Sequence, residues 1–154
     1  MTESDRASER RARERQPTAR DIQALLAFKP ILCADDFVPI REWVGGGKED
    51  GAVVIPYPEY DQAVRDFVDT IVKDGWMDSG YVPAQVEKLI ESERAIERAT
   101  LPQMRAMLTY FVRGERFCDG WWGHMIEKGY IGRILERLAE LEGELDDGRG
   151  RSRR

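Results

Sequence analysis

Histidine and cysteine are scarce in this chain, with one histidine and two cysteines among 154 residues. The sequence contains neither a C-x-x-C nor an H-x-x-x-H pair, so the close ligand pairs typical of a zinc site are missing. It also lacks a dinucleotide-binding fingerprint, a nucleotide-binding loop and a Ser/His/Asp spacing. We therefore expect no metal and no cofactor, and the sequence favours a non-enzymatic protein.

Long apolar runs are missing as well, because none approaches the roughly 20 residues that cross a bilayer. The N-terminal stretch MTESDRASERRARERQ has no apolar segment of the kind found in secretory signals. These two features predict a cytoplasmic protein without a membrane partner. In a reducing compartment, Cys33 and Cys118 are expected to remain thiols rather than to form a disulfide.

Charge is unevenly distributed along the chain. Residues 1–20 carry six arginines against four acidic residues, and residues 148–154 carry four arginines and no acid. Because the whole chain has a net charge of −5, residues 21–147 carry a net charge of −11. An acidic body does not suit binding along a nucleic-acid backbone. The basic tails can still make weak, salt-dependent contacts with nucleic acid, although solvated ends are the simpler interpretation.

Apolar residues recur at helical spacing, in steps of three and four, in several stretches of the chain. The clearest are Val64, Phe67, Val68, Ile71 and Val72; Leu101, Met104, Leu108 and Phe111; and Ile131, Ile134, Leu138, Leu141 and Leu145. Thr18, Asp61 and Thr100 suit the N-caps of helices, and Asp119 suits the cap of a short helix that ends at Gly129. We predict an all-α fold, a compact single domain of about six helices with one of them short.

Residues 31–60 are the hardest part of the sequence to interpret. We expect a short helix between Ala34 and Val44, with Phe37 and Trp43 as core anchors. The glycine-rich residues 45–51 predict a flexible loop without the spacing of a phosphate-binding loop. Residues 52–57 allow a minor extended segment, although two prolines nearby favour a loop.

The expected domain boundaries follow from these patterns. Residues 1–17 are predicted to be a disordered basic tail, residues 18–146 the helical domain, and residues 147–154 a disordered arginine-rich tail.

Cys118, Asp119 and His124 are the candidate catalytic residues. Cys118 and Asp119 lie at the N-terminal edge of the predicted short helix, where amide dipoles can lower the pKa of a thiol. A cysteine–histidine nucleophile pair can therefore be drawn. His124 lies a full turn or more from Cys118 and points away from the cap, so a packed or half-exposed histidine is the simpler interpretation.

Arg113 and Arg116 are candidate ligands for a small anion such as a phosphate or a carboxylate. The same arginines can instead pair with Glu115, with Asp119 or with the acidic body. Local ion pairing is the favoured interpretation because the body is strongly acidic.

Trp121 and Trp122 are candidate interface residues, since neighbours on a helix point about 100° apart and one of them can be left at the surface. The alternative is that neighbouring helices cover both rings. Our leading hypothesis is a non-enzymatic helical interaction module that binds a protein partner or a second copy of itself. The alternatives are a small-anion or catalytic pocket around Arg113, Arg116, Cys118 and His124, and weak nucleic-acid association through the tails.

One part of the sequence resembles a known family. The resemblance rests on DFV at residues 66–68, DGW at residues 74–76, and on Arg113, Glu115, Arg116, Phe117, Cys118, Asp119, Gly120, Met125, Glu127, Gly129, Ile131 and the ILERL segment at residues 134–138. These positions look like a prokaryotic domain-of-unknown-function family, over roughly residues 21–141. The resemblance implies one compact domain, and it implies no activity, ligand or catalytic residue.

Overall fold

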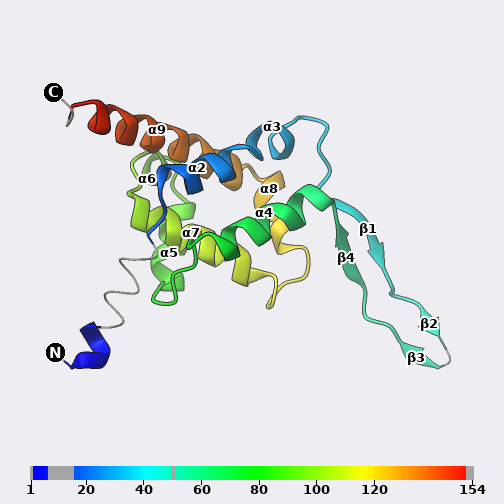
Figure 1. Ribbon diagram of the computed structural model, residues 1–154. Helices are drawn as coiled ribbons and strands as arrows, with labels where there is room; N and C mark the ends of the chain where they lie inside the picture. Colours follow the sequence, from blue (N-terminus) through cyan, green and yellow to red (C-terminus); the bar gives the residue numbers. More distant parts are fainter. Residues whose placement is uncertain (1, 7–15, 50, 152–154) are drawn as a thin grey trace.

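Eight helices, α2 to α9, pack around a shared core in the part of the chain that the computed structural model describes, residues 2–6, 16–49 and 51–151 (Figure 1). The helices are α2 (Ala19–Leu26), α3 (Lys29–Leu32), α4 (Gln62–Lys73), α5 (Pro83–Ile90), α6 (Glu93–Glu97), α7 (Leu101–Gly114), α8 (Trp121–Glu127) and α9 (Tyr130–Arg151). The strands are β1 (Ile40–Val44), β2 (Lys48–Glu49), β3 (Ala52–Val53) and β4 (Tyr57–Tyr60). None of the described helices is long and apolar enough to cross a membrane.

Local sequence accounts for where the main helices begin. Thr18 and Thr100 each form a capping box, with Asp21 and Gln103 as their reciprocal partners. Asp61 caps α4, its carboxylate accepting the Ala63 N–H at 2.9 Å. These three predicted caps are therefore confirmed.

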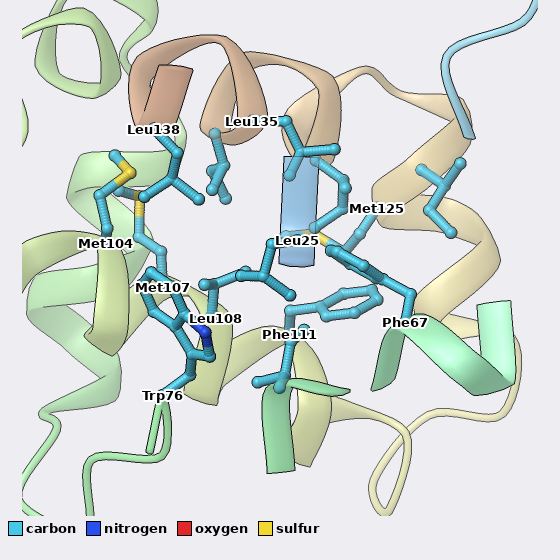
Figure 2. Close-up of a cluster of buried hydrophobic side chains, with 14 of the residues drawn as sticks. Leu25, Phe67, Trp76, Met104, Met107, Leu108, Phe111, Met125, Leu135 and Leu138 are labelled. Atoms are coloured by element: carbon cyan, nitrogen blue, oxygen red, sulfur yellow. The ribbon is translucent and has the colours of Figure 1, made fainter. Parts of the chain in front are cut away.

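The core lies between α9 and the helices that it crosses, and its apolar side chains meet in one cluster (Figure 2). Met104 and Phe111 of α7 and Ile134 and Leu138 of α9 are fully buried, as their spacing predicts. Burial of a side chain of this size contributes roughly 1.5–3 kcal/mol relative to its exposure. Val72 is the exception in its stretch, because it lies on the outer side of α4 and is exposed.

The all-α prediction is only partly correct, because residues 40–49 and 51–60 form the two sides of an antiparallel β-hairpin that projects from the helical body (Figure 1). We call this segment the arm. β1 pairs with β4, Trp43 lying opposite Pro58 and Val44 opposite Tyr57, and β2 pairs with β3 nearer the tip. The helix predicted between residues 34 and 44 is therefore wrong, because residues 34–39 form turns and loop and residues 40–44 form β1. Trp43 is exposed rather than a core anchor, and Phe37 is half-buried against the core.

The count of about six helices is also too low, for two local reasons. Pro30 lies in the first turn of a separate short helix, α3, instead of only ending the helix before it. The charged stretch after α5 breaks at Glu91, and Ser92 caps α6, whose Ile96 is buried. The broad prediction of a mostly helical fold holds, and the small hairpin is the part that it missed.

The predicted N-terminal tail lies mostly outside the described residues, since positions 1 and 7–15 are not described, and so do positions 152–154 of the predicted C-terminal tail. α9 remains helical to Arg151, past the end expected at residue 146. The hypothesis that the tails contact nucleic acid rests largely on the positions that are not described, so it stays a prediction.

Candidate functional site

The junction between α7 and α8 holds most of the residues that the sequence marks as candidates. α7 ends at Gly114 and α8 begins after Gly120, whose φ of 89° lies in the left-handed region that glycine tolerates. Asp119 was predicted to cap α8, but the N-cap is Gly120 and Asp119 is exposed. The capping carboxylate belongs to Glu115, which accepts the N–H groups of Gly120 and Trp122, each at 2.9 Å.

Glu115 also ties the arm to this junction. The hydroxyl of Tyr60, the last residue of β4, donates to the Glu115 carboxylate at 2.7 Å. Burial, followed by this hydrogen bond and the charge of Glu115, raises the pKa of Tyr60 far above its ordinary value of 10.0. Tyr60 therefore stays protonated, and one carboxylate joins the base of the arm to the start of α8.

The candidate catalytic residues do not form a nucleophile–base arrangement. Cys118 and His124 are both exposed, and the Cys118 thiol contacts the Asp119 carbonyl oxygen at 4.0 Å. The His124 ring stacks on Trp121 with 5.8 Å between the centroids. The described residues also contain no group of three His, Cys, Asp or Glu side chains that can hold a metal ion.

The two adjacent tryptophans are both half-buried. Trp122 packs against Tyr60 and Phe111, and its indole N–H donates to the Val112 carbonyl at 3.2 Å. Trp121 meets the Tyr110 ring edge to face at 5.4 Å. Both rings therefore pack against neighbouring side chains but are only partly covered, and their role as interface residues stays a prediction.

A cavity of about 290 Å³ lies beside Trp121, and it brings Arg113 and Cys118 together. It is lined by Tyr81, Pro83, Glu87, Tyr110, Arg113, Gly114, Phe117, Cys118 and Trp121. Arg116, Asp119 and His124 are not among these residues, so only part of the predicted pocket exists. The residues from α5 and from the loop before it were missed by sequence reasoning, because they lie about 30 positions from Arg113.

The cavity is lined by one arginine and one glutamate, and these two side chains do not pair with each other. The Arg113 guanidinium lies 5.3 Å from the centroid of the Tyr81 ring, and it forms no ion pair with another described residue. The Glu87 carboxylate accepts the Tyr110 hydroxyl at 3.3 Å. Burial, and then the nearby Glu87 charge, raises the pKa of Tyr110, which therefore remains a donor. Arg113 is thus a cation in an aromatic cavity, without a carboxylate partner among the described side chains.

The arm carries the largest gathering of exposed apolar side chains on the described surface. Trp43 is 52% exposed, Val53 74%, Ile55 76% and Tyr57 49%. Contacts with α8 hold the base of the arm, where Trp43 lies against Gly120 and Ile40 against Gly123. Sequence reasoning missed this surface, although the uncharged run from Gly51 to Pro58 is visible in an otherwise highly charged chain.

Comparison with protein families finds a match over most of the chain. Residues 17–144 match the model of a family described as "Family of unknown function (DUF6508)". No curated protein and no solved structure matches the chain.

Proposed function

Since the chain belongs to the DUF6508 family, which is described as a family of unknown function, we propose a function from the structure itself. The chain is a non-enzymatic interaction module, and it self-associates through the arm, residues 40–60. The observation that carries this proposal is the exposure of Trp43, Val53, Ile55 and Tyr57 on an element that projects away from the body (Figure 1).

An isolated two-stranded hairpin is marginally stable in water. The base of this arm contacts the helices through Ile40, Trp43 and Tyr60, while Val53 lies in the tip strand β3 and Ile55 between β3 and β4. Clustered exposed apolar side chains of this kind mark a contact surface, since water solvates them poorly. Burying them against another chain would stabilise the arm and remove that unfavourable exposure.

Charge argues for a second copy as the partner. Residues 51–58, which include the tip strand β3, carry no charged side chain. The helical body, residues 21–39 and 61–147, has a net charge of −9, since the arm carries −2 of the −11 on residues 21–147, and two such bodies repel at close approach. Contact between the residue 51–58 segments of two arms joins uncharged stretches and keeps the acidic bodies apart.

Prolines favour contact through side chains rather than through strand edges. Pro58 of β4 and Pro56, just before the strand, lack N–H groups, so the outer edge of β4 is a poor template for adding another strand. A side-chain contact between two such arms can close into a two-fold dimer. We therefore expect a discrete dimer and not a fibre.

Replacing Val53 with lysine is expected to weaken self-association by about tenfold or more, because the charge must be desolvated in an apolar contact. Sedimentation equilibrium across protein concentration measures this change. Val72→Lys is the matched control, since Val72 is a 52%-exposed valine on α4, outside the arm, and it should leave self-association unchanged. A wild-type chain that stays monomeric at every concentration would contradict the proposal.

We also propose a cytoplasmic location. Cys33 and Cys118 are exposed free thiols in the structure, and exposed thiols suit a reducing compartment.

A further inference from the structure

We propose that the cavity between α5, α7 and α8 is a binding site for a small aromatic carboxylate. This site is separate from the arm, and the inference does not depend on self-association. The supporting features are the aromatic walls of the cavity, its single unmatched cation and an exposed phenylalanine held at its rim.

Aromatic rings make up much of the wall. Tyr81, Tyr110, Phe117 and Trp121 come from three different parts of the chain and converge on a space of about 290 Å³. This volume is near the lower end of the range for small-molecule sites, so it suits a ligand with one ring. Aromatic walls favour a flat, aromatic ligand because ring pairs add offset or edge-to-face contacts to simple burial.

The position of Arg113 selects for negative charge. Its guanidinium lies over the Tyr81 ring, and its N–H groups donate to no other described residue, so they can donate to a ligand. Glu87, the carboxylate that lines the same cavity, already accepts the Tyr110 hydroxyl and is not within ion-pair distance of Arg113. A ligand carboxylate can take two parallel hydrogen bonds from the guanidinium and supply the missing counter-charge.

Phe117 provides an independent indication of a ligand. Its side chain is 87% exposed, yet it borders the cavity. The turn after α7 fixes the backbone there, since the Phe117 and Cys118 N–H groups both donate to the Gly114 carbonyl at 3.1 Å. A bound ring would cover this face of Phe117 and bury apolar surface that water now contacts.

Three small probes separate the roles of charge and ring. Phenylacetate carries both features, phenylacetamide has nearly the same shape without the charge, and cyclohexylacetate keeps the charge without the aromatic ring. We expect phenylacetate to bind the full chain with a dissociation constant on the order of 0.1 mM, and each of the other two to bind about tenfold more weakly. Binding is followed by the backbone amide chemical shifts of Tyr81, Tyr110, Phe117 and Cys118 in isotope-labelled protein.

Arg113→Gln should weaken phenylacetate binding about tenfold and leave phenylacetamide binding unchanged, which also shows that the variant keeps the cavity. Arg116→Gln is the matched control, because Arg116 is an exposed arginine three positions away that does not line the cavity. Equal binding of phenylacetate and phenylacetamide would overturn the proposal. So would an equal loss in the two arginine variants, or the absence of shifts at these amides with every probe.

Discussion

Replacing Gly114 with alanine is expected to lower the free energy of unfolding by about 3 kcal/mol, because the new methyl group has no room. A Cβ at this position would lie 2.2 Å from Nε1 and 2.3 Å from Cδ1 of Trp121. The indole cannot move away without losing contacts, since Tyr110 and His124 pack against it. Urea-induced unfolding measures this loss. The dependence of the unfolding free energy on urea concentration, the m-value, should be the same for the variant and the wild-type chain.

Gly143→Ala is the control for this substitution. Gly143 is an exposed residue of α9, and a Cβ there would meet nothing within 4 Å. Alanine at such a helical site stabilises by about 0.5–1 kcal/mol. If Gly114→Ala behaved in the same way, Trp121 would not pack over Gly114 as described.

The second large effect is expected at Glu115. Glu115→Ala removes the acceptor of three donors, the Tyr60 hydroxyl and the N–H groups of Gly120 and Trp122. Leaving partly buried donors without a partner costs about 1–3 kcal/mol each, and the losses overlap, so we expect about 3 kcal/mol in total. For a chain of this size that is a fall in melting temperature of roughly 10 °C, measured by calorimetry.

Three further variants test whether this loss comes from the arm–junction link. Glu140→Ala removes a carboxylate that pairs with Arg137 on the surface of α9, and it should cost no more than about 0.5 kcal/mol. Tyr60→Phe, alone and combined with Glu115→Ala, gives a double-mutant cycle with a coupling of about 1 kcal/mol. Additive losses in that cycle would show that Tyr60 and Glu115 do not act together.

Much of the helical body could be predicted from sequence because its determinants are local. The three-and-four spacing of α4, α7 and α9 places one apolar face inward, and the caps at Asp61 and Thr100 lie next to the helices that they begin. Met104 and Leu138 are buried for this reason. Such patterns lie within one or two helical turns, so they can be recognised without knowledge of the fold.

The arm was missed because its pattern is irregular. The pairing register shifts between Ile40 and Glu42, which interrupts the alternation that marks a strand. Trp43 then looked like a core residue, since a large aromatic side chain is more often buried than exposed. Its exposure follows from the way the hairpin leaves the body, which no short stretch of sequence specifies.

The candidate site was only partly predictable because it joins distant segments. Arg113 and Cys118 were identified from their own neighbourhood, and both line the cavity. Tyr81 and Glu87 belong to the segment around α5, and only packing of α5 against α7 brings them there. The cap from Glu115 was missed for a similar reason, because its carboxylate reaches forward to Gly120 and across to Tyr60.

Backbone amide hydrogen exchange at low and high protein concentration tests most directly the claim that the arm is the contact surface. At low concentration the amides of residues 52–57 should exchange rapidly, because that part of the hairpin has little support from the body. At high concentration we predict slower exchange in the arm, with the amides of α4, α7 and α9 unchanged. Exchange in the arm that is the same at both concentrations, or protection that rises instead on α8 and α9, would contradict this account.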